Sequence, residues 1–404
     1  MNRKLWVVIH RWLGLIMAGF LLIIGLTGSL LAFYPELEGW INPELYPTEQ
    51  QGKPMMSLAQ LALRAEQLQP QAMATRVQWG AIGSRAVYVA PKINPETNQL
   101  YSLPFNQIFI NPYTGEQLGL RQFGAISQGM INFMPFIYHL HYELALSDFG
   151  MWALGIIALI WTLDCFIGLY LTFPAKSFSI KRQRIHTKKS WLARWKPAWL
   201  IRWHANAYKL NFDLHRSGGL WLWLILLTFA WSSVYMNLWD TVYTKATQSV
   251  MEYKAYWTEF KPVDDTTNSP HIGWLLAEQI AQNLMAEKAT TQGFKVIRAV
   301  SLYYNKSLGV YDYRVRSSRD IQDHGGQTQL FIDANTGAFK LLLLPTGQYE
   351  GNTVTTWLFT LHMANILGLP YKVFVSVLGV AIVMLSITGV YIWLRKRISR
   401  SAVN

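Results

Sequence analysis

The sequence predicts a membrane α-helical bundle of four spans, arranged as two pseudo-twofold repeats, with two α+β domains outside the cytoplasm. Three observations indicate this fold class. Hydrophobic residues make up 51% of the 404 residues, long polar stretches separate the apolar runs, and several motifs occur twice in the same order. Such a chain has more apolar surface than a soluble domain usually has, and it is part membrane protein and part globular protein.

Four apolar runs are long enough to cross about 30 Å of hydrocarbon as helices. They predict transmembrane helices at residues 5–34, 151–173, 215–239 and 372–394. The first run is too long for the core of a signal peptide, and no small-residue cleavage site follows it. We therefore interpret it as a retained anchor.

Basic residues set the expected orientation. The loop at residues 174–214 carries ten lysines and arginines against one acid, Asp213, and more basic residues lie before the first span and in the tail at 395–404. Because basic flanks stay on the cytoplasmic side, we expect both termini and this loop in the cytoplasm. The nearest partner of the loop is then anionic membrane lipid, and we expect no nucleic-acid binding.

The two connections on the other side of the membrane follow one plan. Each begins with an amphipathic helix pattern, from Ser57 and from Ile272, and continues with strand-like alternation. In each connection one strand is followed by a matching turn. Asn111 starts the turn in the first connection, Asp333 starts it in the second, and a glycine closes both turns. The domains cover residues 36–130 and 240–353, and the expected strands cover 86–90, 108–111, 311–316 and 329–333.

The order span, helix, antiparallel strands, span therefore occurs twice. The segments 131–150 and 354–368 complete it as expected interfacial helices at the outer membrane face. Because both repeats enter the membrane from the same side, a pseudo-twofold axis along the membrane normal is expected. Equivalent residues would face each other across that axis.

Four histidines occupy matching places in the two repeats. His10 and His215 each precede an arginine near the cytoplasmic end of a span, and His141 and His362 each follow a leucine before the next span. The alternative for a lone histidine is a polar role at the membrane interface, but the duplication favours a role as a metal ligand. Two neutral imidazoles fill both axial positions of a b-type haem. The pattern predicts two haem b groups, an inner one on His10 and His215 and an outer one on His141 and His362.

The charged residues nearby leave alternatives open. Arg11 and Arg216 either hold the haem propionates through paired hydrogen bonds or extend to the lipid interface. Asp164 is the one carboxylate inside a predicted span, where an unpaired charge is costly, so a partner is expected. Arg11, Arg216, a proton path and a hydrogen-bonded structural contact are the candidates for its role.

The other histidines have weaker claims. His139 lies two residues from His141 and so points to another face of a helix, and Thr360 stands at its place in the second repeat. The repeat therefore selects His141. We assign His204, with His186, to the basic loop, and we expect His271 and His324 to lie on the surface of the outer domains.

Together these features resemble the PepSY-associated transmembrane helix family, bacterial inner-membrane proteins that include iron-regulated ferrisiderophore reductases. The similarity covers nearly the whole chain, and the order and duplication of the motifs carry it. The resemblance implies a di-haem membrane protein with two periplasmic PepSY-like domains that reduces a ferric siderophore. The matching residues are His10-Arg11-Trp12-Leu13-Gly14, Asp213-Leu214-His215-Arg216 with Gly219-Leu220, Leu140-His141, Leu361-His362, and the turns Asn-Pro-Tyr-Thr-Gly and Asp-Ala-Asn-Thr-Gly.

The expected function is a haem-dependent ferric-chelate reductase that releases ferrous iron from a ferric siderophore. Its electron donor, cytoplasmic or quinol, is not evident, because the chain has no GxGxxG or Walker motif. The rival is a haem-free scaffold or regulator whose PepSY-like domains bind peptide or a protease, which leaves the four histidines without a role. An iron-complex permease would need polar residues at mid-membrane, and those are scarce. The single cysteine, Cys165, excludes an internal disulfide and cysteine-based metal motifs.

Overall fold

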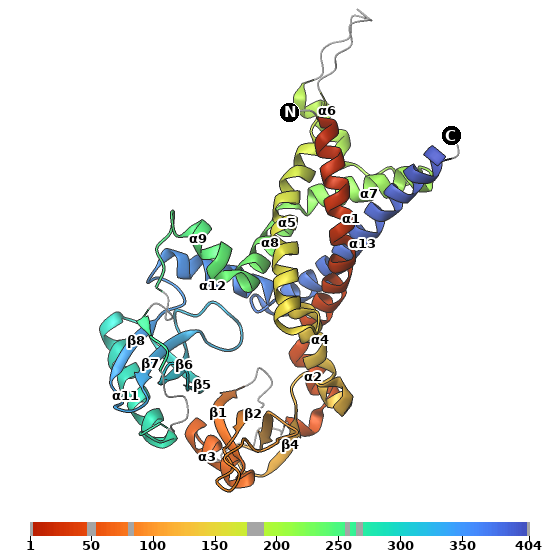
Figure 1. Ribbon diagram of the computed structural model, residues 1–404. Coiled ribbons are helices and arrows are strands. Elements are labelled where there is room, and N and C mark those ends of the chain that lie inside the picture. The colour runs from red at the N-terminus through yellow and green to blue at the C-terminus, as the bar shows by residue number, and fades with distance from the viewer. Residues whose placement is uncertain are drawn as a thin grey trace, which may run out of the picture. The chain divides into compact units, whose positions relative to one another are not determined.

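A computed structural model describes residues 3–46, 54–79, 85–175, 190–254, 259–263 and 270–401 (Figure 1). Residues 176–189 of the predicted basic loop, which include Lys188 and His186, lie outside the described residues. The chain divides into two compact units. The first comprises Met1–Ala32, His139–Lys245 and Pro370–Asn404, and the second comprises Phe33–Tyr138 and Ala246–Leu369.

The first unit is a bundle of helices, drawn in red, yellow, green and blue in Figure 1. Three of them are long and apolar enough to cross a membrane: α1 (Arg3–Leu31), α5 (Ser147–Thr172) and α13 (Gly368–Ser401). A further pair, α7 (Ala207–Trp221) and α8 (Trp223–Asn237), meets the same criterion only together. Within the described residues the chain thus has three candidate spans, or four if that pair is one span.

The pair α7 and α8 is bent by 70° at a one-residue break. The sequence Ser217-Gly218-Gly219 lies one turn before the break, and glycine and serine are the residues at which helices bend without proline. Hydropathy predicted one continuous helix at 215–239, because an apolar window carries no information on backbone direction. The structure instead places His215 on α7, before the bend.

Short helices precede two of the candidate spans. Helix α4 (Phe133–Glu143) comes before α5, and α12 (Glu350–His362) comes before α13. His141 lies near the end of α4, and His362 is the last residue of α12. Shorter elements include α2 (Tyr34–Ile41), α6 (Trp191–Trp195), the 3-10 turn η4 (Lys196–Trp199) and α9 (Thr244–Thr247).

The second unit contains one antiparallel sheet of eight strands in the order β4-β3-β2-β1-β5-β6-β7-β8. Strands of the two outer segments meet where β1 pairs with β5, with Arg76 opposite Tyr303 and Val77 opposite Leu302. The two predicted outer domains therefore share one continuous sheet. The strands are β1 (Ala72–Trp79), β2 (Arg85–Pro91), β3 (Gln107–Ile110), β4 (Gln117–Arg121), β5 (Val296–Asn305), β6 (Val310–Ser317), β7 (Thr328–Asp333) and β8 (Phe339–Leu343).

Helices α3 (Leu58–Leu68) and α11 (Trp274–Gln292) pack on this sheet and close a common core with it. Ser57 and Gln60 form a reciprocal capping box at the start of α3. Glu278 of α11 joins the two helices, because its carboxylate accepts hydrogen bonds from the Ser57 hydroxyl (2.5 Å) and the Ala59 N–H (3.0 Å). A buried carboxylate thereby satisfies N–H groups that a helix start leaves without partners.

The two predicted turns are confirmed. Oδ1 of Asn111 accepts from the Tyr113 N–H at 2.9 Å, and Oδ1 of Asp333 accepts from the Asn335 N–H at 3.0 Å. Gly115 and Gly337 close the turns with φ of 73° and 74°. This left-handed conformation favours glycine, which has no Cβ to clash with the backbone.

Candidate functional site

His10 of α1 and His215 of α7 lie side by side in the first unit. Their ring centres are 6.1 Å apart, with ring planes tilted by 56°. With metal–nitrogen bonds of about 2 Å, as imidazole makes to zinc, two imidazoles on opposite sides of one metal have ring centres roughly 6 Å apart. The structure therefore brings together two residues 205 positions apart at the separation that axial ligands of one iron need.

Each ring is oriented through its Nδ1 atom. His10 Nδ1 donates to the Asp164 carboxylate of α5 at 2.9 Å. His215 Nδ1 donates to the Leu385 carbonyl of α13 at 3.0 Å and lies 3.3 Å from the Thr388 hydroxyl. A hydrogen bond from one ring nitrogen fixes the tautomer and leaves Nε2, with its lone pair, for a metal.

Asp164 thus has a defined partner, which the sequence left open. The carboxylate pairs with His10, and among the described residues no ion pair joins it to Arg11 or Arg216. Asp164 is 6% exposed, and a buried carboxylate is costly unless it is hydrogen-bonded.

Glycines on the neighbouring helices give the rings room. A Cβ added to Gly389 of α13 would lie 3.2 Å from Cε1 of His215, and one added to Gly168 of α5 would lie 3.6 Å from Cε1 of His10. Gly168 follows His141 by 27 residues and Gly389 follows His362 by 27 residues, so the two glycines hold equivalent places in the two repeats. Small residues let helices approach closely in a bundle, and here they let an imidazole do so.

His141 has the same arrangement at the other end of α1. Its Nδ1 lies 2.9 Å from the Thr27 hydroxyl, and its Cε1 would lie 3.0 Å from a Cβ on Gly28. Because that hydroxyl donates to the Ile23 carbonyl, it accepts from Nδ1 of His141. Burial lowers the pKa of His141 to about 4, so the ring is neutral at physiological pH, and the neutral form is the one that can bind a metal.

His362 lies in the second unit, at the end of α12. Three residues later Asn365 fixes the turn that follows: its side-chain amide donates to the Gln322 side chain (3.0 Å) and the His324 carbonyl (2.9 Å). Asp323 adds a hydrogen bond from the Gly368 N–H at 2.7 Å. The loop between β6 and β7 therefore holds the end of the helix that carries His362.

The remaining histidines take other roles. His139 pairs with Glu143 one turn later on α4, which occupies its Nδ1. A bonded Nδ1 is a feature that His139 shares with His10 and His141, so the choice of His141 rests on the repeat and stays a prediction. His204, His271 and His324 are exposed.

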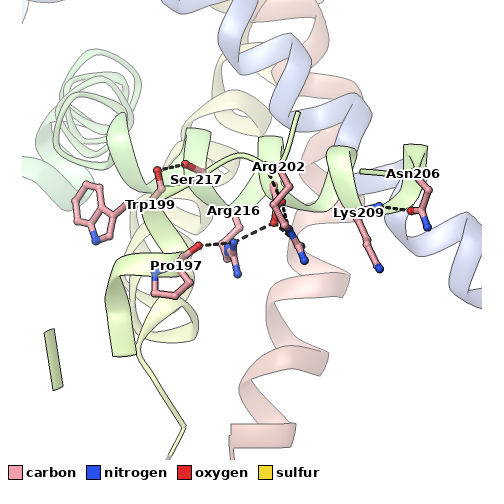
Figure 2. Close-up of polar contacts among 8 residues, drawn as sticks. Pro197, Trp199, Arg202, Asn206, Lys209, Arg216 and Ser217 are labelled. Carbon is pink, nitrogen blue, oxygen red and sulfur yellow. Dashed lines mark hydrogen bonds and ion pairs between the residues drawn. The ribbon is translucent and has the colours of Figure 1, made fainter. Parts of the chain in front are cut away.

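Arg216 is held by the segment that precedes α7 (Figure 2). It donates to the Pro197 carbonyl at 2.7 Å and to the buried Asp213 carboxylate at 3.0 Å, and Asp213 also binds Arg202 at 2.6 Å. The Nε of Arg216 is buried without a hydrogen-bond partner among the described residues. These bonds give Arg216 a structural role and leave its Nε–H without a partner in the described part of the chain.

The sequence missed three of these contacts. Thr27 accepts through its hydroxyl and Leu385 through its backbone carbonyl. No sequence motif marks such an acceptor, because every residue has a carbonyl and many have a hydroxyl. Asn365 lies three residues after His362, and this closeness in the sequence was the signal that could have found it. Within the described ranges, no three His, Cys, Asp or Glu side chains gather into a group that could hold a bare metal ion. A pair of histidines instead suits a metal cofactor whose own nitrogen atoms fill the other coordination positions of the metal.

A family model described as the PepSY-associated TM region matches residues 7–396. A search of curated proteins found no match.

Proposed function

The chain belongs to the family of the PepSY-associated TM region, and from this premise we propose that it is a di-haem b protein of the bacterial inner membrane that reduces a ferric siderophore and releases ferrous iron. One observation carries the proposal. His10 and His215, from separate helices, lie with ring centres 6.1 Å apart, and each donates from Nδ1 to a fixed acceptor. Two rings prepared in this way are what the axial positions of one haem require.

The proposed architecture is four spans in two repeats, with α7 and α8 together as the third span. Both termini and the basic loop face the cytoplasm, and the shared sheet stands in the periplasm. The support is the excess of basic residues beside the spans, and the matched histidines and turns of the two halves. Membrane lipid is the expected surrounding of the helices.

The second haem would be held by His141 and His362. The support for His141 is its neutral, hydrogen-bonded ring, and the support for His362 is its equivalent place in the second repeat and its fixed helix end. Arg11 and Arg216 are the proposed propionate partners, Arg216 through its unpaired Nε. When bound, the haems would supply one-electron transfer from a cytoplasmic or quinol donor to the periplasmic side.

The first experiment is the haem content of the purified protein. We expect about two equivalents per chain, with an absorption spectrum of low-spin b haem. His10→Ala and His215→Ala should each lower the content by one, and His141→Ala and His362→Ala should remove the other haem. His139→Ala is the matched control and should keep both. A colourless protein would instead favour the haem-free scaffold or regulator.

The second experiment tests the substrate. Chemically reduced protein is mixed with a ferric siderophore and a ferrous-specific chromophore, and reoxidation of the haem is followed together with colour formation. We expect both signals to rise together, and His362→Ala to slow them. Reoxidation by a quinone but by no ferric chelate would show that the protein serves a respiratory chain and not iron release.

A further inference from the structure

We infer that Asp164 sets the electronic asymmetry of the inner haem site: it is a positioning residue that makes His10 a stronger iron donor than His215 and thereby lowers the reduction potential of that haem. The inference rests on the proposed function. It starts from the acceptors of the two Nδ1–H groups, which differ in charge.

The acceptors come from equivalent places in the two halves of the chain. Asp164 lies four residues before Gly168 on α5, and Leu385 lies four residues before Gly389 on α13. Each glycine packs against the ring that its helix orients. The geometry of the two halves is thus shared, but one half offers a carboxylate and the other a backbone carbonyl.

The difference in charge has a definite consequence for the ring. A carboxylate that accepts an N–H bond draws the proton toward itself, so the ring becomes more basic and donates more strongly through its other nitrogen. A neutral carbonyl does this less. Asp164 is buried, so water screens its charge little, and within the described residues His10 is its ion-pair partner.

The consequence for the iron follows from charge. The oxidised haem carries one more positive charge than the reduced haem, so a negative carboxylate one imidazole away stabilises the oxidised form. Removal of that charge should favour reduction. The other haem site has no carboxylate at the known acceptor, since His141 uses the Thr27 hydroxyl.

The test compares variants that keep the hydrogen bond with variants that keep the charge. Asp164→Asn retains an oxygen that can accept from His10 but carries no charge, whereas Asp164→Glu keeps the charge. Thr388→Val is the matched control, because it removes the neutral hydroxyl near His215 and leaves the Leu385 carbonyl in place. Spectroscopic redox titration of the full protein gives the potential of each haem, and electron paramagnetic resonance of the oxidised haem reports ligand strength.

For Asp164→Asn we expect the reduction equilibrium constant of one haem to rise about tenfold, which for one electron is about 59 mV. The other haem should stay within twofold, as should both haems in Thr388→Val and Asp164→Glu. Asp164→Ser serves as the second uncharged variant if Asp164→Asn does not retain the inner haem. Equal potentials in the charged and uncharged variants would overturn the inference and leave the haem function intact. A wild-type protein without haem would overturn the proposed function itself.

Discussion

Single residues decide how closely each imidazole approaches its neighbouring helix. His141, His215 and His10 rest against Gly28, Gly389 and Gly168, and the space left for a methyl group differs among the three. A contact of 3.0–3.2 Å at Gly28 and Gly389 requires the ring to move, whereas 3.6 Å at Gly168 is ordinary van der Waals contact. The three positions therefore form a graded series.

Gly28→Ala and Gly389→Ala should each weaken retention of one haem, Gly28→Ala of the outer and Gly389→Ala of the inner. Overpacking of this kind costs about 1–3 kcal/mol, since the ring leaves its oriented position. Gly168→Ala should have a smaller effect. Haem content after washing with apomyoglobin, a haem acceptor, measures retention. Gly19→Ala is the control, because in the described part of the chain no atom beyond the neighbouring residues and the backbone of its own helix lies within 4 Å of a Cβ there. Equal losses in all four variants would contradict the steric argument.

At the scale of elements, the sequence predicted what depends on local pattern. The long apolar helices, the two turns and the strands β2, β3, β6 and β7 all have a periodicity or a turn residue that short windows contain. The sequence analysis did not predict the strands β1, β4, β5 and β8. It also did not predict the pairing of β1 with β5 at Val77 and Leu302, because that contact joins segments 225 residues apart. The bend between α7 and α8 was not predicted for a different reason, because glycine permits a bend in a helix without requiring one.

The candidate site likewise has features that a sequence pattern indicates and features that depend on contacts between distant segments. Repetition pointed to the four histidines, because each pair recurs at matching places in the two halves of the chain. The partner of Asp164 was out of reach, since His10 is 154 residues away and the choice among His10, Arg11 and Arg216 depends on helix rotation. The acceptor of His215 could not have been found, because a backbone carbonyl is present at every position.

The turn between β7 and β8 should give the sheet a dependence on acid. Burial raises the pKa of the Asp333 carboxyl, but hydrogen bonds from the Asn335 and Thr336 N–H groups and from Lys340 outweigh this and lower the pKa to about 2. A carboxyl with a lowered pKa stabilises the fold above its unfolded value of about 4, and this stability is lost as the pH falls toward 2.

Asp333→Asn should therefore leave the turn formed but abolish its acid sensitivity, whereas Asp333→Ala should cost about 2 kcal/mol at neutral pH. Hydrogen exchange of peptides that cover β7 and β8, corrected for the intrinsic exchange rate, measures the turn between pH 2 and 6. Asn111→Asp in the matching turn is the reciprocal variant and should introduce such a dependence. A turn that responds to acid equally in wild type and Asp333→Asn would refute the assignment.

At the scale of the whole molecule, orientation in the membrane decides which end of the chain can meet a ferric chelate. The proposal places the sheet in the periplasm and the segment before α7 in the cytoplasm, on the excess of basic residues beside the spans. Because Cys165 is the only cysteine, Cys165→Ser gives a cysteine-free background. Single cysteines can then be placed at exposed positions that the structure describes.

Glu116→Cys and Ala338→Cys lie in the two turns of the sheet, and Ala193→Cys and His204→Cys lie before α7, all at exposed residues. In intact cells with a permeable outer membrane, an inner-membrane-impermeant maleimide should label the first two and not the last two. After lysis all four should react, which shows that each cysteine is accessible. This pattern would place the helix ends that bear His141 and His362 on the side where a ferric siderophore arrives. The inverse pattern would put the His10 and His215 pair there, and the inner pair would then be the exit site for electrons.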